Sequence, residues 1–382
     1  MGNTMVWLLF WVSFGLLLYS FIGFPLLVFL RGTLAHSTEY PPYTPTLTLI
    51  IAAYNEAPVI RQKLENTFSL DYPSDSLEVV VASDGSDDET VALVQQYQDP
   101  RVKLLSLPRQ GKNLTLNAAV ETASGEILVF TDADTMIAPD ALRHLTAPFS
   151  DPKIGGVAGD YRHAAKKAEA AGERNFWSFE RLLKRLQSRA GSITSAWGPI
   201  YAIRKSLFVP IPIGVTDDFF ISVQSLVAHQ RLIFEPQAVA TGPVANSAGA
   251  EFQRKVRIIT AGLRAVWQTR TLLNPFKYGF LSLQIFSHKV LRRLMGFPLL
   301  ILMITAPMLW TAGWFYQIMT LCQIGLHGAA MFGFLLQRRP IGQSKVLRLP
   351  FFLDLVYVAA AFALFNLFRG TRHDIWVPQH NQ

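Results

Sequence analysis

The chain has 382 residues, of which half are hydrophobic and only 16% are charged; this is apolar for a soluble protein and long for a single domain. The single cysteine excludes a disulfide framework and a metal site built from cysteines. The net charge of +8 favours an anionic partner, such as a membrane surface, a nucleic acid or an anionic substrate.

The N-terminal segment Met5–Leu30 is almost continuously apolar and about long enough to cross a bilayer as a helix. No lysine or arginine precedes it and Arg31 follows it directly, which is typical of an anchor rather than a secretory signal. Because positive flanks stay in the cytosol, we expect residues 1–39 to form a transmembrane anchor and the following domain to be cytosolic.

Over residues 40–250, short β-rich runs alternate with helix-compatible stretches. The predicted strands are Leu47–Ala52, Leu77–Ala82, Val102–Leu107, Glu126–Thr131, Ile154–Gly159, Ile200–Ile203 and Leu232–Phe234. The predicted helices are Pro58–Leu70, Glu89–Tyr97, Asn113–Thr122, Pro139–Pro148 and Arg174–Arg189. This alternation predicts an α/β domain with a mostly parallel sheet. Such sheets bind ligands beyond the carboxyl ends of their strands, where the acidic motifs of this region fall.

Polar motifs follow the first three predicted strands. Tyr54 is suited to stack on a base, and Glu56 to accept a hydrogen bond from its ring, although an ordinary loop also explains both. Asp84 lies before Gly85 in a tight turn, where it suits a ribose or base, or else a helix cap. Lys112 lies at a predicted helix start, which suits a phosphate or else a solvated turn; its spacing is not that of a Walker loop.

Asp132-Ala133-Asp134 follows an apolar predicted strand and is the most informative motif of the chain. Residues i and i+2 of a strand share a face, so we expect both carboxylates to meet one cation. Mg²⁺ and Mn²⁺ prefer oxygen ligands, and Mg²⁺ sites usually combine few carboxylates with water and substrate phosphates. The motif therefore predicts a divalent metal that holds a nucleotide diphosphate; the alternative is a pair of loop-entry aspartates.

Thr216-Asp217-Asp218-Phe219 precedes the predicted helical stretch Ile221–Gln230. Asp217 there favours a helix N-terminus whatever else it does. Adjacent carboxylates raise each other's pKa, so that one of them can serve as a general base near neutral pH. We assign that role to Asp218, with Asp217 as its electrostatic neighbour.

Basic residues interleave with apolar ones over Glu251–Lys277, the pattern of an amphipathic helix on a membrane surface. Arg254 and Arg257 share one face of this helix at i and i+3, and could grip a diphosphate. Ser287–Arg293 is interpreted as a second interfacial piece.

The C-terminal region is predicted to contain about three spans. Gly296–Leu336 is apolar but broken near Gln317 and near Gln323–His327, which fits two spans, and Phe351–Phe368 is a third. Few charges lie inside these stretches, which disfavours a channel or transporter, and the chain lacks a nucleic-acid module. The predicted parts after the α/β domain are interfacial helices over 251–294, transmembrane helices over 295–369 and a tail over 370–382.

Six motifs occur in the order found in the membrane-bound family 2 glycosyltransferases, which include the synthases of hyaluronan, cellulose and poly-N-acetylglucosamine, and the chain resembles that family. The resemblance covers about Leu47–Arg293, about two-thirds of the chain. Its motifs are Tyr54-Asn55-Glu56, Ser83-Asp84-Gly85-Ser86, Gly111-Lys112, Asp132-Ala133-Asp134, Thr216-Asp217-Asp218 and Arg254-Lys255-Val256-Arg257. Each is weak alone, and their ordered occurrence is specific.

The resemblance implies a GT-A fold, with a mostly parallel mixed sheet joined to transmembrane and interfacial helices. It also implies a nucleotide-diphosphate-sugar donor, usually UDP-linked. By this analogy Tyr54, Glu56 and Asp84 hold the nucleoside, and Lys112 lies near the base or the diphosphate.

The same resemblance assigns Asp132 and Asp134 to the metal, Mg²⁺ or Mn²⁺, and to the donor diphosphate. Asp218 matches the catalytic base. Arg257 keeps its charge for the leaving diphosphate, and Arg254 precedes it on the same helix face.

Three departures from the family pattern stand out. Ser83-Asp84 replaces a double Asp, and Asp217-Asp218 replaces the usual Glu-Asp. Processive members carry Gln-x-x-Arg-Trp, whereas this chain has Arg254-x-x-Arg257-Ile258, and Trp267 lies too far along to replace the missing tryptophan. The change leaves transfer of a single sugar, or synthesis of short chains, open beside long-chain synthesis.

We expect an inverting, integral-membrane glycosyltransferase of a bacterial inner membrane, acting on a UDP-sugar and a glycan or glycolipid acceptor among membrane lipids, without nucleic acid. The alternative is a non-catalytic nucleotide-sugar-binding scaffold or subunit of a polysaccharide synthesis complex, which the altered arginine motif would support. The intact set of aspartates favours the enzyme.

Overall fold

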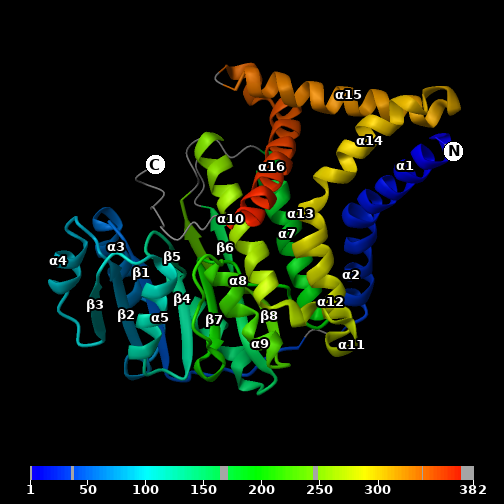
Figure 1. Ribbon diagram of the computed structural model, residues 1–382. Helices are drawn as coiled ribbons and strands as arrows, with labels where there is room; N and C mark the ends of the chain where they lie inside the picture. Colours follow the sequence, from blue (N-terminus) through cyan, green and yellow to red (C-terminus); the bar gives the residue numbers. More distant parts are fainter. Residues whose placement is uncertain (1, 36–37, 164–170, 244–247, 338, 371–382) are drawn as a thin grey trace.

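The computed structural model describes residues 2–35, 38–163, 171–243, 248–337 and 339–370. An α/β domain built on one sheet occupies one side of the molecule, and helices from both ends of the chain lie together beside it (Figure 1). The predicted tail beyond residue 370 lies outside the described residues.

One eight-stranded sheet forms the centre of the α/β domain, in the order β3-β2-β1-β4-β7-β6-β8-β5. The strands are β1 Leu47–Ala53, β2 Leu77–Asp84, β3 Val102–Leu107, β4 Ile127–Asp132, β5 Met136–Ile137, β6 Ile154–His163, β7 Ile200–Arg204 and β8 Arg231–Gly242. Four of the seven pairings are parallel and three are antiparallel. The predicted mixed, mostly parallel sheet is thereby confirmed.

Helices cover both faces of the sheet. Ile50 of β1 packs on the side of α5 (Lys112–Thr122), whereas Ile51 packs on the side of α3 (Ala57–Phe68) and α6 (Ala141–Thr146). Because both faces are covered, the central strands are continuous apolar runs. Their polar residues gather mainly at the carboxyl ends, where the sequence motifs lie.

The remaining helices run from the domain into a helical bundle. They are α1 Gly2–Leu18, α2 Phe24–Thr33, α4 Thr90–Gln95, α7 Ala171–Arg189, α8 Asp217–Ser222, α9 Gln224–Val227, α10 Ala248–Gln268, α11 Pro275–Tyr278, α12 Phe280–Ile285, α13 Arg292–Leu294, α14 Gly296–Met308, α15 Trp314–Leu335 and α16 Lys345–Phe368. Two π-helical segments interrupt them, η1 at Tyr19–Gly23 and η6 at Phe286–Leu291. Helix α2 packs on α7, and α10 packs on both α8 and α16, so the bundle is joined to the domain (Figure 1).

Three helical segments in the described part of the chain are long and apolar enough to cross a membrane: Thr4–Thr33, Trp314–Leu335 and Lys345–Phe368. Phe280–Leu294 and Gly296–Met308 qualify together as a fourth, broken by a bend of 52°. Membrane association of the chain is therefore supported at both of its ends.

The predicted layout of the C-terminal helices is wrong in one respect. Helix α15 runs without a break through Gln317 and Gln323–His327, and the chain instead turns at Trp310–Gly313. Isolated polar side chains do not break a helix, whereas Pro307 lies near the end of α14, just before this turn, and Gly313, with a positive φ, ends it.

A second difference concerns Ser287–Arg293, predicted as a separate interfacial piece. It belongs to the helical segment that bends directly into α14. Because α14 has only 13 residues, it is too short to cross a bilayer alone, and the two segments together make one candidate span.

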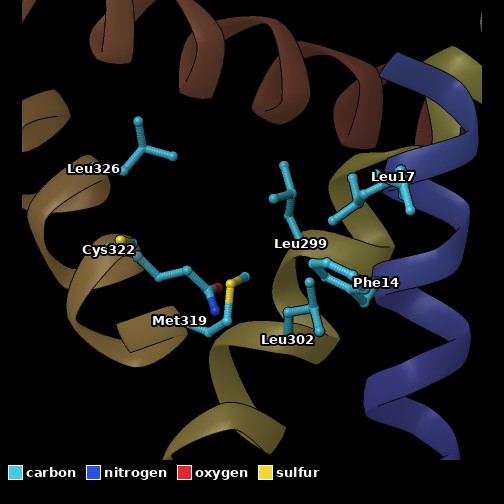
Figure 2. Close-up of a pocket in the computed structure, with 9 residues that line it drawn as sticks. Phe14, Leu17, Leu299, Leu302, Met319, Cys322 and Leu326 are labelled. Carbon is cyan, nitrogen blue, oxygen red and sulfur yellow. The ribbon is translucent and has the colours of Figure 1, made fainter. Parts of the chain in front are cut away.

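An apolar cavity of about 400 Å³ lies where α1, α14 and α15 meet (Figure 2). Its walls include Phe14 and Leu17 of α1, Leu302 of α14, and Met319 and Cys322 of α15. The cavity belongs to the helical bundle and is separate from the polar ends of the strands.

Candidate active site

The Asp132-Ala133-Asp134 motif lies where β4 ends. Asp132 is the last residue of β4, and Asp134 follows in a turn, so the expectation that both share one strand face is wrong. Burial, reinforced by the negative charge of Asp132, raises the pKa of Asp134. The turn nevertheless leaves the two carboxylates close enough to interact, and the charges of Lys112 and Lys63 act on Asp134 in the opposite direction.

Lys112 connects this motif to the second acidic motif. It is the first residue of α5, and its Nζ lies 2.8 Å from Oδ1 of Asp132 and 3.2 Å from Oδ2 of Asp217. Asp132 and Asp217 are 85 residues apart in sequence (217 − 132), yet they share one ammonium group. The structure therefore brings both acidic motifs into one site.

Asp217 and Asp218 begin α8. Burial, and then the charge of Asp217, raise the pKa of Asp218 to about 6. The backbone N–H of Phe219 donates to Oδ1 of Asp218 at 2.7 Å. A methyl group at Gly198 would lie 3.7 Å from Oδ2, so the loop before β7 passes beside this carboxylate. A buried aspartate with this pKa suits a general base at neutral pH.

Glu56 joins the same acidic cluster from the end of β1. It is only 3% exposed. Burial, followed by the charges of Asp134 and Asp132, raises its pKa to about 8. Four predicted site carboxylates, at positions 56, 132, 134 and 218, therefore lie around or next to Lys112, whose positive charge acts on each of them.

Asp84 lies apart from this cluster and holds the loop before α5. Its carboxylate is fully buried, accepts hydrogen bonds from the backbone N–H groups of Gln110 (2.7 Å) and Gly111 (2.9 Å), and pairs with Arg109. Gly85 has φ +67°, and a Cβ there would lie 2.6 Å from the backbone nitrogen of Arg109. Asp84 therefore fixes the loop that carries Lys112.

Tyr54 lies under Arg109. The guanidinium Cζ of Arg109 is 3.3 Å from the centroid of the Tyr54 ring, a cation–π contact. The tyrosine predicted to stack on a base thus presents its ring to a planar cation at the end of β1, next to the loop anchored by Asp84.

The two arginines of α10 differ in their surroundings. Nε of Arg254 lies 2.8 Å from Oε2 of Glu251, an ion pair within the helix. Burial, and then the neighbouring Arg254, lower the pKa of Arg257, and the negative charge of Asp217 acts in the opposite direction. Arg257 therefore lies within electrostatic reach of Asp217, whereas Arg254 is paired one turn earlier.

Sequence reasoning missed Lys63. This lysine of α3 is fully buried, and its Nζ donates to Oγ1 of Thr131 (2.9 Å) and to the carbonyl of Thr135 (2.5 Å), on either side of the Asp132 motif. The signal was its position on the buried face of α3, in register with Ile60 and Leu64.

Comparison with known proteins gives a consistent result. Residues 48–210 match the family model described as "Glycosyl transferase family 2". A poly-beta-1,6-N-acetyl-D-glucosamine synthase of Staphylococcus epidermidis is 27% identical over 237 residues, which cover 58% of this chain and 57% of that protein. An N-acetylglucosaminyltransferase of Mesorhizobium japonicum is 26% identical over 318 residues, 76% of this chain and 74% of that protein. The chain thus spans just over half the length of the Staphylococcus relative.

Among solved structures, the mannosyltransferase PcManGT from Pyrobaculum calidifontis, in complex with GDP-Man and Mn²⁺, superposes with a TM-score of 0.71. The match covers 95% of this chain and all of that chain at 23% identity, and it shows a shared fold that includes the helical bundle. Together, the two comparisons show that residues 48–210 are similar to glycosyl transferase family 2 domains and that the chain shares the fold of this solved glycosyltransferase.

Proposed function

We propose that the chain is a membrane-bound inverting glycosyltransferase that moves a sugar from a UDP-sugar to a polysaccharide or lipid-linked acceptor. The observation that carries this proposal is the position of Lys112, whose Nζ lies within 3.2 Å of both Asp132 and Asp217. The candidate metal motif and the acidic pair that contains the candidate base therefore lie at one point of the structure.

In the proposed reaction, Asp218 removes the proton of an acceptor hydroxyl. The acceptor oxygen forms a bond to the anomeric carbon of the donor sugar from the side opposite the diphosphate. The bond from that carbon to the diphosphate oxygen breaks, and the nucleoside diphosphate leaves with the electron pair. A single displacement inverts the anomeric carbon. Arg257 and Lys112 neutralise the charge that develops on the leaving group.

Asp132 and Asp134 are the residues that would hold a divalent metal, Mg²⁺ or Mn²⁺. Within the described ranges, no group of three or more His, Cys, Asp or Glu side chains is arranged to hold a metal, so phosphate oxygens and water would complete the ligand set. Burial, and then the negative charge of Asp132, raise the pKa of Asp134, and a bound cation would favour the ionised form of both carboxylates. When bound, the metal would supply charge stabilisation to the diphosphate.

The donor-binding roles are part of the same proposal. Tyr54 and Glu56 hold the nucleoside, and Asp84 contributes by holding the Arg109 loop that packs on Tyr54. In this proposal residues 40–250 form a cytosolic catalytic domain at a bacterial inner membrane, held by the N-terminal anchor, with Arg31 on the cytosolic flank.

The test uses the full chain in phosphatidylcholine nanodiscs with a panel of UDP- and GDP-sugars, with release of the nucleoside diphosphate as the readout. We expect metal-dependent release with one donor. Asp134→Ala should lower the affinity for UDP in the presence of metal at least about 10-fold, whereas the exposed control Asp75→Ala should not.

Two results would contradict this proposal. Undiminished metal-dependent UDP affinity in Asp134→Ala would remove the metal role of that residue. Absence of nucleotide release from the wild-type chain with every donor, despite UDP binding, would favour the non-catalytic scaffold.

A further inference from the structure

A second set of cations lies beside the acidic pair, and the proposed reaction does not use it. Lys289 of η6 places its Nζ 2.5 Å from Oγ of Ser195 and 5.7 Å from the ring centroid of Phe219. Phe219 directly follows the candidate base, Asp218, and the negative charge of Asp218 acts on both Lys289 and Arg293. These two cations therefore border the base from the side of the helical bundle.

The Arg293 guanidinium occupies a space that α10 leaves for it. A Cβ at Gly262 would lie 2.7 Å from Nη2 and 2.9 Å from Nη1 of Arg293. Nη1 is buried and, among the described residues, has no hydrogen-bond acceptor. Leaving a buried donor without an acceptor is costly, more so on a charged group, so this atom points to a ligand that supplies an acceptor.

The local charge balance supports the same conclusion. Glu180 pairs with Arg292 (2.5 Å) and His288 (3.3 Å), so the negative charge of Glu180 already has partners. Lys184 is a further buried amine near Asp218; burial lowers its pKa to about 7, and its Nζ lies 2.5 Å from the carbonyl of Ser195. Asp218 thus faces Lys184, Lys289 and Arg293, and buried charges are normally paired. An anion bound here would balance the surplus.

The position of these cations indicates the source of the anion. Arg293 lies three residues before Gly296, the start of the apolar helix α14, at the 52° bend of the candidate broken span. η6, which carries Lys289, is a π-helix, a form often found at functional sites. An anion at this point lies where the site meets the segment expected to enter the bilayer.

We propose that Arg293 and Lys289 bind the phosphate of a lipid-linked acceptor, whose sugar hydroxyl then faces Asp218. The inference rests on the proposed function and narrows its acceptor. The donor diphosphate is assigned to Lys112 and Arg257, so each anionic group has its own cations. The acceptor phosphate is held and undergoes no reaction.

The first experiment compares two amphiphiles that differ in charge. Full-length protein in phosphatidylcholine nanodiscs is titrated with dodecyl phosphate and with dodecanol, and binding is followed by the shift in unfolding temperature. We expect dodecyl phosphate to bind the wild-type chain at least about 10-fold more tightly, as expected for charge-assisted hydrogen bonds. Arg293→Gln and Lys289→Gln should each lose most of that preference, whereas Arg61→Gln, at an exposed arginine, should keep it.

A second variant leaves the charges in place. Gly262→Ala places a methyl group where the Arg293 guanidinium lies, so the guanidinium must move, although alanine is the better helix former. We expect it to reduce the preference for dodecyl phosphate several-fold without lowering the unfolding temperature. This variant keeps the test decisive if Arg293→Gln fails to fold.

Three outcomes would overturn the inference: equal affinity of the wild-type chain for the two amphiphiles, an unchanged preference in folded Arg293→Gln or Gly262→Ala, and competition by inorganic phosphate as strong as that by dodecyl phosphate. The last would mark a site for free phosphate. Metal-dependent UDP binding is measured on the same preparations. If the wild-type chain shows no metal-dependent UDP binding, the proposed function is refuted. If it binds UDP but does not prefer dodecyl phosphate to dodecanol, this inference alone is refuted.

Discussion

The two halves of the site are built differently. The proposed donor half consists of loops at the carboxyl ends of β1, β2 and β4, fixed by backbone hydrogen bonds such as those that Asp84 accepts. The proposed acceptor half consists of helices: α8 with the candidate base, α10 with Gly262, and η6–α13 with Lys289 and Arg293. The first half is tied to a rigid sheet. The second depends on how the helical bundle packs onto the domain.

The largest effect expected is on the acceptor half alone. Asp218→Asn removes the proposed base and should lower kcat by about 10²–10⁴-fold. UDP affinity should stay near that of the wild-type chain, because the donor half is untouched. Single-turnover transfer and calorimetric UDP binding check the two parts, with the exposed Asp75→Asn as control. Near-normal sugar transfer by Asp218→Asn would contradict the assignment of Asp218 as the base.

A change in the donor half should act on stability. Asp84→Asn replaces a fully buried carboxylate that accepts from two backbone N–H groups and pairs with Arg109. We expect the free energy of unfolding to fall by about 2 kcal/mol. Denaturant unfolding of the chain measures this free energy. Asp87→Asn, at an exposed position shortly after Asp84, should change the free energy of unfolding little. An equal fall in the free energy of unfolding in both variants would mean that the contacts of Asp84 do not anchor the loop that carries Lys112.

The smallest effect expected is a shift in pH dependence. The pKa of Asp218 is about 6 because burial, and then the charge of Asp217, disfavour its ionised form. The base must be ionised, so the rate should fall as the pH falls through about 6. Asp217→Asn removes the repulsion, so this acid limb should move to lower pH, by roughly one unit. A pH–rate profile of kcat for both proteins checks this, and a shift to higher pH would contradict the assignment.

Much of the donor half could be predicted from sequence. Strands buried on both faces give apolar runs, and the motifs stand out as polar residues at their ends, as with Asp132 after Ile127–Thr131. The confirmed mixed sheet follows from that contrast, and the similarity to family 2 follows from the order of the motifs. The length of β8 could not be predicted, because Pro236 and its polar neighbours Glu235 and Gln237 interrupt the strand pattern in its middle.

The acceptor half left a weaker trace in the sequence. Lys289 and Arg293 resemble any basic stretch at a membrane surface, and their position beside Asp218 depends on packing across more than 70 residues. Lys63 was missed for a similar reason: a lysine in a helix is usually solvated, and its partners Thr131 and Thr135 lie far along the chain. Tertiary contacts, rather than local patterns, assign these side chains.

In the proposed reaction, the Lys112 ammonium group, which Asp132 and Asp217 share, also links donor binding to the basicity of Asp218. Its positive charge lowers the pKa of Asp218, and so weakens that carboxylate as a proton acceptor while no donor is present. A diphosphate that draws on the same ammonium would cancel this influence and make Asp218 more basic. Arrival of the activated sugar would then switch on the group that prepares its partner.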